Sequence, residues 1–467
     1  MLTLAQALRL ARPGNSASDP TSTGPVTIAL VGAGGKTTAM FALARQLRPA
    51  LVTTTTHLGV WQASAADSHL VWSLSAPPWE AASAPLDRDV ILVTRALDKA
   101  GQRLAGLAID EVAALRSWPG GLGRSLLIEA DGSRGRPLKA PASHEPAMPD
   151  HADLVVVTAG LSGLGTPLDD SHVHRPDAFS RLSGVMAGAG IDVPALARVL
   201  THPEGGLKHI PTGARRVALL NQADTDALAR QGRELAQRLL PTYHAVVIAH
   251  HQGLTVHGLH APESAGAASV IGVHEPVGGI ILAAGGSSRY GVPKPLLEFR
   301  GKPFVRAVAE TALAAGLSPV VIVTGACHEP VLAAVGGLQV RAVHNAAWAD
   351  GQSTSVKAGL GTLSGEVGAV VFLMADQPHV PVDLIRALTD RHAATFGPVV
   401  APVVHGCRVS PVLFDRSTFR DFAALTGDVG GRGVLVKHPV EAVAWPDDRL
   451  LLDVDTPEDY RRLLDQP

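Results

Sequence analysis

The chain has 467 residues, of which 46% are hydrophobic and 18% charged, and its formal net charge is −2. This length exceeds one ordinary domain and predicts two large units, while the near-neutral charge indicates no nucleic-acid partner. The two cysteines, Cys327 and Cys407, lie far apart, so no structural zinc site is expected, and 20 scattered histidines do not indicate a dedicated metal site.

Short apolar runs alternate with amphipathic helical patterns in both halves of the chain. This alternation predicts an α/β protein with two three-layer αβα domains and mainly parallel sheets. Residues 1–13 are amphipathic but interrupted by Gln6 and Arg9, so no export signal is expected. No run of about 20 apolar residues occurs, which predicts no membrane span and no membrane partner. We therefore expect a cytoplasmic enzyme.

The first chemical motif follows an apolar run at 26–31 and precedes a helical pattern at 39–47. Strand, Gly-Lys-Thr loop and helix form the context of a P-loop, where backbone N–H groups surround phosphates. Because the first glycine of the standard motif would fall at Leu30, the loop is shortened and resembles that of ATP-dependent ligases. A phosphate-free loop is the alternative. The residues assigned to this nucleotide site are Gly32, Gly34, Gly35, Lys36, Thr37 and Thr38.

Carboxylates follow the apolar run at 125–128. Glu129 and Asp131 stand at this strand end, where a metal contact for a bound nucleotide is needed. We expect them, together with the Thr37 hydroxyl, to be able to hold Mg²⁺ beside ATP or GTP.

A second candidate contact with the nucleotide follows the apolar run at 217–220. The sequence Asn-Gln-Ala-Asp at 221–224 resembles the Asn-Lys-x-Asp guanine-binding motif of GTPases, with Gln in place of Lys. Asn221 and Asp224 are therefore candidate base-binding residues. The alternative is an ordinary turn, since Asn and Asp are common after strands.

As a whole, residues 1 to about 260 resemble the selenium-dependent hydroxylase accessory proteins, known as the YqeC-like family. This resemblance implies a P-loop-like nucleotide-binding domain that assists the maturation of molybdenum hydroxylases, and it leaves the reaction undefined. No residue marks selenium chemistry. The resemblance rests on the segments 31–38, 53–57, 129–141, 160–165, 174–175 and 221–224.

A domain boundary is expected near residue 270. Residues 261–269 are small and polar, which is typical of a linker. We therefore assign residues 1–262 to the N-terminal domain, 263–275 to the linker and 276–467 to the C-terminal domain.

The most informative stretch of the chain, 282–294, lies between a predicted strand at 278–282 and a predicted helix at 304–315. Its glycines let the backbone approach phosphate oxygens, and Arg289 and Lys294 supply positive charge. This combination predicts a triphosphate-binding loop for nucleotidyl transfer, whereas an ordinary Gly-rich connection would not need both cations. The residues of this stretch assigned to nucleotide binding are Leu282, Ala283, Ala284, Gly285, Gly286 and Ser287.

Three aspartates are expected to form a magnesium site. Asp376 follows the apolar run at 369–373, and a carboxylate at the end of a buried strand beside a triphosphate loop suits a hard cation. Alternation in a strand would place Asp453 and Asp455 on one face, and one of them is expected to complete the site. The following Thr-Pro-Glu at 456–458 also predicts a helix start, so capping alone is an alternative role for Asp455.

These segments resemble, in order, the molybdenum cofactor nucleotidyltransferases of the MobA/MocA-like group. The resemblance covers 282–294, 344–359, 374–378 and 452–459. It implies a Rossmann-like nucleotidyltransferase fold. It also places a further set of residues beside the nucleotide, namely Asn345, Gly351, Ser353 and Ser355.

The Ala-Ala-Gly at 283–285 resembles family members that transfer CMP, as do the segments 410–414 and 426–433. The resemblance implies transfer of CMP from CTP to molybdopterin with release of pyrophosphate, and a molybdenum hydroxylase or cofactor-delivery protein as partner. A phosphate nucleophile needs no general base, so the expected catalytic residues Arg289, Lys294 and Asp376 would position and neutralise charge. Two alternatives remain, a sugar or polyol phosphate as acceptor and a nucleotide-switched carrier of the cofactor.

Overall fold

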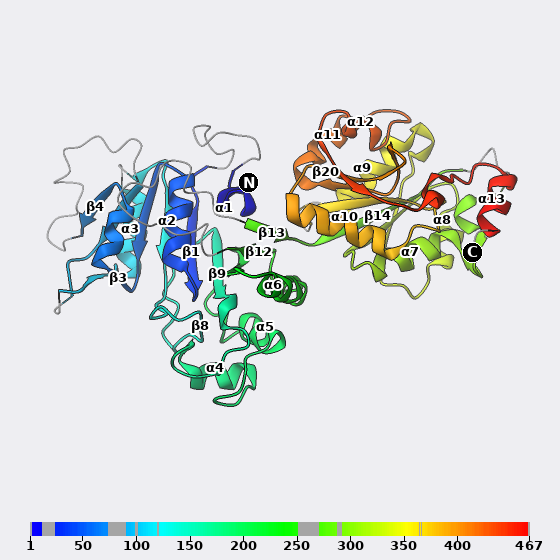
Figure 1. Cartoon of the computed structure of the whole chain (residues 1–467). Coiled ribbons are helices and arrows are strands. Elements are labelled where there is room, and N and C mark those ends of the chain that lie inside the picture. Colours follow the sequence, from blue (N-terminus) through cyan, green and yellow to red (C-terminus); the bar gives the residue numbers. More distant parts are fainter. Residues whose placement is uncertain are drawn as a thin grey trace. The chain divides into compact units, whose positions relative to one another are not determined.

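The structure is a computed structural model in which the chain forms two compact units, Met1–His274 and Glu275–Pro467 (Figure 1). In each unit helices cover both faces of a mainly parallel sheet, so the predicted α/β three-layer fold is confirmed. The residues that the structure describes are 2–11, 24–72, 90–98, 101–118, 121–250, 270–286, 292–363, 365 and 367–465.

The sheet of the N-terminal unit has the strand order β13-β12-β11-β9-β1-β7-β2-β5-β4. All neighbouring strands are parallel except β12 and β13. The central strands are apolar and buried on both faces, as parallel strands between two helical layers require. The strands are β1 Thr27–Gly32, β2 Ala50–Thr54, β4 Ser68–Val71, β5 Val90–Thr94, β7 Ser125–Glu129, β9 Leu154–Gly160, β11 Arg215–Asn221, β12 Ala245–Ala249 and β13 Val270–His274.

Helix α2 packs on β1, β2 and β7 and is accompanied by α1. The other face carries the core cluster formed with α3, α4, α5 and α6. Two separate two-stranded sheets are formed by β3 with β6 and by β8 with β10. The bounds are α1 Leu4–Ala7, α2 Lys36–Gln46, α3 Ile109–Ser117, α4 Pro176–Ser183, α5 Val193–Thr201, α6 Asp226–Leu239, β3 His57–Gly59, β6 Arg103–Ala105, β8 Leu138–Lys139 and β10 Val173–His174.

The predicted linker at 263–275 is wrong in its last part, which forms strand β13. Within 263–275 the described part begins at Val270, and residues 270–274 pair with β12 in the N-terminal sheet. Val270, Ile271 and Val273 are β-branched and at least half-buried, so this segment is an edge strand rather than a free connection.

The sheet of the C-terminal unit has the order β18-β17-β14-β19-β22-β20-β21, and β23 also pairs with β20. Strands β14, β17, β18 and β19 are parallel, while β22 runs antiparallel to both β19 and β20. The strands are β14 Val277–Ala283, β17 Val320–Thr324, β18 Arg341–His344, β19 Ala369–Met374, β20 Val399–Val404, β21 Cys407–Arg408, β22 Val412–Asp415 and β23 Val440–Ala444, with a separate pair β15 Glu298–Phe299 and β16 Lys302–Pro303.

Two helical layers enclose this sheet, and Figure 1 shows α7 and α10 together on one face. The cluster on that face also includes α8, and the opposite cluster joins α9, α11 and α12. The bounds are α7 Phe304–Ala314, α8 His328–Ala334, α9 Gln352–Leu363, α10 Val382–Thr395, α11 Phe419–Ala423, α12 Arg432–Leu435 and α13 Pro457–Leu464.

The segment with Asp453 and Asp455 is not a strand, which corrects that expectation. It is a connection between a 3₁₀ turn at 448–451 and α13. The predicted helix start is confirmed, because Thr456 caps α13 through the backbone N–H of Asp459 and Pro457 stands at its first position.

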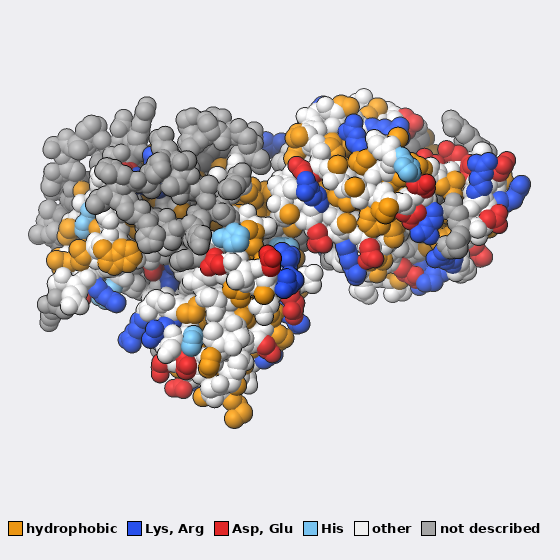
Figure 2. All heavy atoms as spheres, viewed as in Figure 1, with side chains coloured by type: hydrophobic (Ala, Val, Ile, Leu, Met, Phe, Trp, Pro, Cys, Tyr) orange, Lys and Arg blue, Asp and Glu red, His pale blue; other side chains and the backbone are white. Residues whose placement is uncertain are grey.

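Charged side chains of both signs are interspersed on the face of the C-terminal unit that Figure 2 shows. No helix among the described residues is long and apolar enough to cross a membrane.

The aromatic cluster beneath α11 yields a stability prediction. Phe422 is fully buried, with its ring centroid 5.0 Å from that of Phe414 and 5.4 Å from that of Phe372. Truncation leaves a cavity, so Phe422→Ala should lower the free energy of unfolding by about 3–5 kcal/mol in chemical denaturation. Val436→Ala, at a side chain that is 85% exposed, is the control and should change it by less than about 0.5 kcal/mol. Equal losses would contradict the packing described.

Candidate functional site

A cleft of about 660 Å³ opens at the carboxyl ends of β14 and β19 in the C-terminal unit. Ligands of parallel α/β sheets bind at such strand ends, and this volume is in the range of small-molecule sites. The predicted residues that line it are Leu282, Ala283, Ala284, Gly285, Lys294, Gly351, Ser355 and Asp376.

Lys294 lies among the predicted carboxylates. Its Nζ is 2.7 Å from Oδ1 of Asp455 and 3.8 Å from Oδ2 of Asp376. Burial raises the pKa of Asp376, Lys294 opposes this, and the charges of Asp453 and Asp455 raise it further. The structure therefore brings the three aspartates and the lysine into one electrostatic group.

This group fits a magnesium ion that arrives with a nucleotide. The described residues include no set of three or more His, Cys, Asp or Glu side chains arranged to bind a metal by themselves. Mg²⁺ is commonly held by one or two carboxylates plus substrate phosphates and water. Asp376 and Asp455 supply such hard oxygen ligands on either side of Lys294.

Asn345 and Ser353 are buried behind the cleft and do not line it. Asn345 donates from Nδ2 to Oγ1 of Thr354 at 2.8 Å and to Oγ of Ser355 at 3.0 Å, and its Oδ1 accepts the Ala347 N–H. The N–H of Ser353 donates to the Gly427 carbonyl at 3.2 Å. Both residues thus hold the start of α9 in place.

Gly351 must be glycine for steric reasons. Its φ is +113°, and a Cβ would lie 2.3 Å from the carbonyl carbon of Gly427. This close approach joins the start of α9 to the segment that carries Asp428, another residue lining the cleft.

The cleft residues that were not singled out from the sequence include Trp348, Gln352, Met374 and Asp428. Each lies inside a segment that carried the family resemblance, which was the available signal. Gly286 adjoins the cleft, since a Cβ there would be 3.1 Å from the Trp348 ring. The predicted Ser287 and Arg289 lie outside the described residues.

The shortened P-loop of the N-terminal unit is built on three glycines with left-handed backbones. Their φ angles are +95° at Gly32, +81° at Gly34 and +111° at Gly35. A Cβ would lie 2.2 Å from the Thr158 carbonyl oxygen at Gly32, 2.3 Å from the Gly160 nitrogen at Gly34, and 2.5 Å from Nδ2 of Asn221 at Gly35. The loop therefore approaches β9 and the end of β11 closely.

Lys36 and Thr37, at the start of α2, face the end of β7. Lys36 is 3% exposed, and its Nζ donates to the Gly32 carbonyl at 2.6 Å and lies 3.3 Å from Asp131. Thr37 donates from Oγ1 to Glu129 at 2.6 Å. Burial raises the pKa of Glu129, against the opposing effects of Lys36 and Thr37. The predicted lysine, threonine and two carboxylates are thus together, and Thr38 follows in the first turn of α2.

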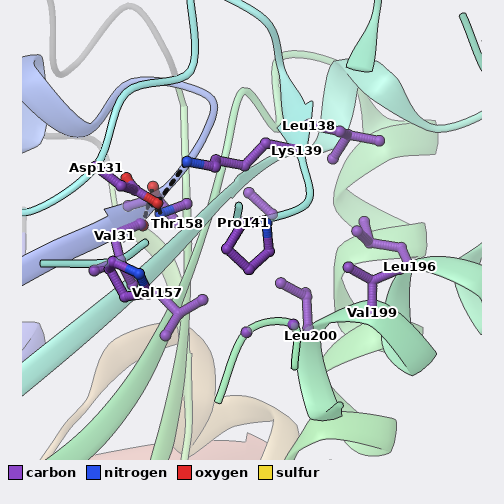
Figure 3. A pocket seen from close by; sticks show the side chains of 15 residues that line it. Val31, Asp131, Leu138, Lys139, Pro141, Val157, Thr158, Leu196, Val199 and Leu200 are labelled. Carbon is purple, nitrogen blue, oxygen red and sulfur yellow. Dashed lines mark hydrogen bonds and ion pairs between the residues drawn. The ribbon is translucent and has the colours of Figure 1, made fainter. Parts of the chain in front are cut away.

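A further buried pair of charges extends from Asp131. The Asp131 carboxylate accepts the Gly32 N–H at 3.0 Å and lies 2.8 Å from Nζ of Lys139 (Figure 3). Lys139 also contacts Glu145 at 2.8 Å, and Arg175 binds both oxygens of Glu145. These partners were not predicted.

Beside this ion pair is a hollow of about 30 Å³ lined mainly by apolar side chains (Figure 3). It has room for roughly one or two water molecules and is far too small for a nucleotide. The surroundings of the Asp131 and Lys139 pair are therefore poorly hydrated, which strengthens the attraction between them.

Asn221 and Asp224 have different environments. Asn221 is fully buried and donates from Nδ2 to the Gly34 carbonyl at 3.0 Å, while its Oδ1 has no hydrogen-bond partner among the described residues. Asp224 is exposed, with its carboxylate 3.9 Å from Nδ1 of His250. The structure brings Asn221 to the P-loop and leaves Asp224 on the surface.

Comparison with known proteins assigns both units. A family model described as YqeC protein matches residues 28–177, and one described as MobA-like NTP transferase domain matches residues 279–443. The uncharacterized protein YqeC of Escherichia coli K12 is 33% identical over 219 residues, covering 46% of this chain and 83% of that protein. Nicotine blue oxidoreductase of Paenarthrobacter nicotinovorans is 33% identical over 198 residues, covering 40% of this chain and 96% of that protein. The chain belongs to the YqeC family and, in its C-terminal unit, to the MobA-like NTP transferases.

Among solved structures, Rv0371c from Mycobacterium tuberculosis H37Rv is 28% identical and covers 41% of this chain and 98% of its own, with a TM-score of 0.38. Another crystal structure of that protein is a complex with manganese. The P-loop thus lies in the YqeC unit, and the cleft lies in a unit of the MobA-like NTP transferase family.

The P-loop glycines allow a matched test of close packing. Gly34 and Gly188 have φ of +81° and +79°, but a Cβ at Gly188 would meet nothing within 4 Å. Alanine at either position costs about 1–2 kcal/mol of backbone strain. Gly34→Ala should cost about 1–3 kcal/mol more and reduce ATP or GTP binding, because its Cβ overlaps β9. Denaturation and nucleotide titration of both variants measure this, and similar behaviour would refute the close approach.

Glu145 predicts a pH dependence of stability. Burial alone would raise its pKa, but the hydrogen bonds and charges of Arg175 and Lys139 lower it from 4.5 to about 2. Because the folded-state pKa is depressed, this stabilisation is full above pH 4.5 and is lost as the pH falls toward 2. The difference in unfolding free energy between wild type and Glu145→Gln should therefore shrink over that interval. Glu234→Gln, at an exposed residue of α6, is the control, and a constant difference for Glu145→Gln would contradict the network.

Proposed function

We propose that the transferase unit is a cytidylyltransferase that transfers CMP from CTP to molybdopterin and releases pyrophosphate. The observation that carries this proposal is the single lysine between carboxylates, Lys294 with Asp376 and Asp455, at the mouth of a cleft that could hold a nucleotide. A lysine can neutralise the charge of a triphosphate, and neighbouring carboxylates can bind the metal ion that accompanies it.

In this mechanism the terminal phosphate of molybdopterin attacks the α-phosphorus of CTP. A bond forms between that phosphate oxygen and the α-phosphorus, and the bond to the bridging oxygen of pyrophosphate breaks. The attacking oxygen is already ionised, so no base is required. Lys294 would exchange its contact with Asp455 for the substrate. Lys294 and Arg289 would then neutralise charge on the α-phosphate and the leaving group.

When bound, Mg²⁺ neutralises charge on the phosphates of CTP. Asp376, with Asp455 or Asp453, would hold it. Gln377 orients Asp453 through a 3.0 Å hydrogen bond from its Nε2. The backbone of Gly285 and Gly286, with Ser287, would cradle the β- and γ-phosphates.

The preference for CTP rests on the Ala-Ala-Gly turn at 283–285 and on the residues around the base. Asn345 and Ser353 would act indirectly by fixing Gly351 and Ser355 at the cleft. The Trp348 ring lies beside Gly286 and would limit the space that is available to the nucleotide there.

We infer that the YqeC unit binds ATP or GTP with Mg²⁺ at the P-loop. Lys36 would exchange its contacts with Gly32 and Asp131 for the terminal phosphates, and Thr37 would exchange Glu129 for the metal ion. The two units would together serve the maturation of molybdenum hydroxylases in the cytoplasm, with a hydroxylase or a cofactor-delivery protein as partner.

The name of the relative from Paenarthrobacter nicotinovorans raises a second candidate, an oxidoreductase built on the same fold. Hydride transfer would not need the aspartates around Lys294, which favours the transferase. A transferase acting on a sugar or polyol phosphate, or a nucleotide-switched cofactor carrier, would keep the same cleft.

Pyrophosphate release tests the proposal directly. With Mg²⁺ and molybdopterin, wild-type protein should release pyrophosphate from CTP in preference to GTP and ATP. Lys294→Ala and Asp376→Asn should each lower kcat/KM by about 10²–10³-fold, because each removes charge stabilisation of the transferred group.

Lys357→Ala, at an exposed lysine of α9, is the matched control and should retain full activity. If the wild-type protein released no pyrophosphate with CTP, GTP or ATP, the enzyme assignment would be refuted. Pyrophosphate release that occurred only with sugar or polyol phosphates would refute molybdopterin as the acceptor.

A further inference from the structure

The charges around the P-loop of the YqeC unit balance, except on one loop. Three buried or half-buried cations, Lys36, Lys139 and Arg175, face three carboxylates, Glu129, Asp131 and Glu145. Every member of this set has an opposite charge within 4 Å, so the set adds no net charge to the site.

The loop that follows Asp131 carries two further arginines. Arg134 is exposed and Arg136 partly exposed, and neither forms a hydrogen bond or an ion pair from its side chain within the described parts of the chain. The loop itself is ordered by a tight turn in which the Arg136 N–H donates to the Ser133 carbonyl at 3.0 Å, and by the left-handed backbones of Arg134 and Gly135. Two uncompensated guanidinium groups are thus displayed on a fixed turn.

This turn adjoins the P-loop. The carbonyl of Pro137, directly after Arg136, accepts the Gly160 N–H at 2.9 Å and would be 3.0 Å from a Cβ on Gly34. On the other side, β8 pairs with β10, which sets His174 opposite Lys139. Burial, and to a smaller extent the positive charges of Arg175, Lys139 and Arg134, lowers the pKa of His174 to about 4, so its imidazole is neutral near pH 7.

We propose that Arg134 and Arg136 form a second anion-binding site in the YqeC unit, separate from the P-loop, which takes the phosphate group of a small-molecule substrate beside the terminal phosphate of the nucleotide. Arginine suits this task because its planar fork binds phosphate through two hydrogen bonds. The neutral imidazole of His174 can donate a further hydrogen bond at the same edge. This inference takes its position from the proposed nucleotide site, but the second site can be tested without nucleotide.

The test uses the full chain and inorganic phosphate as the probe. Equilibrium dialysis compares wild type with the double variant Arg134→Ala/Arg136→Ala. The matched control, Arg230→Ala/Arg233→Ala, removes two exposed arginines of α6 and so changes the net charge equally. We expect the first pair to weaken binding of one phosphate equivalent at least about tenfold, which is about 1.4 kcal/mol, and the control to leave it unchanged. Thermal unfolding should be the same for all three proteins, since the substituted side chains make no contacts that the fold needs.

Equal weakening by both pairs would mean a general charge effect and would overturn the proposal, as would unchanged phosphate binding in the first pair or none in wild type. Loss of ATP and GTP affinity with phosphate binding retained would assign the arginines to the nucleotide and would also overturn it. CTP-dependent pyrophosphate release should be unaffected by either pair, so failure here is distinct from failure of the transferase assignment.

Discussion

Parallel strand pairing is the constraint on which both candidate sites depend. When neighbouring strands run in one direction, their carboxyl ends meet at one edge of the sheet, and the residues that follow them are brought together from distant parts of the chain. In the YqeC unit this arrangement joins the ends of β1, β7, β9 and β11. In the transferase unit it joins the ends of β14 and β19. The chemistry of each unit therefore lies in loops, while the paired strands fix its geometry.

The two sites manage charge in different ways. In the YqeC unit, Asp131 lies between Lys36 and Lys139 in a nearly dry environment, so each ion is compensated before any ligand arrives. Removing one partner would leave a buried charge unpaired, which is far costlier than losing a surface ion pair. In the transferase unit, Asp376 and Asp455 share Lys294, and Asp453 adds a third negative charge near Asp376, so negative charge is in excess. The first arrangement holds a loop in shape, and the second leaves negative charge that a cation can offset.

Much of this could be predicted from the sequence, because buried parallel strands are continuous apolar runs. The predicted strands at 26–31, 125–128 and 278–282 each correspond to an observed strand, and the glycines at 32, 34 and 35 directly follow or end β1 as the spacing indicated. The linker was partly wrong, since a short edge strand such as β13 carries little signal of its own. The network of Lys139, Glu145 and Arg175 was missed because its partners are far apart in sequence and only the fold joins them. Asn345 was assigned to nucleotide binding from the sequence, but its side-chain amide instead donates hydrogen bonds to Thr354 and Ser355. This orientation depends on packing that no local sequence pattern specifies.

Strand β13 has a consequence for any attempt to separate the two units. Only Glu275 and Pro276 stand between the end of β13 and the start of β14. Cutting the gene after residue 262, where the N-terminal domain was predicted to end, would leave β13 on the transferase half and remove it from the YqeC half. The unpaired N–H and C=O groups of β12 would then form an open, apolar sheet edge, which is a template for aggregation. The YqeC unit thus needs β13 to cover the edge of its sheet.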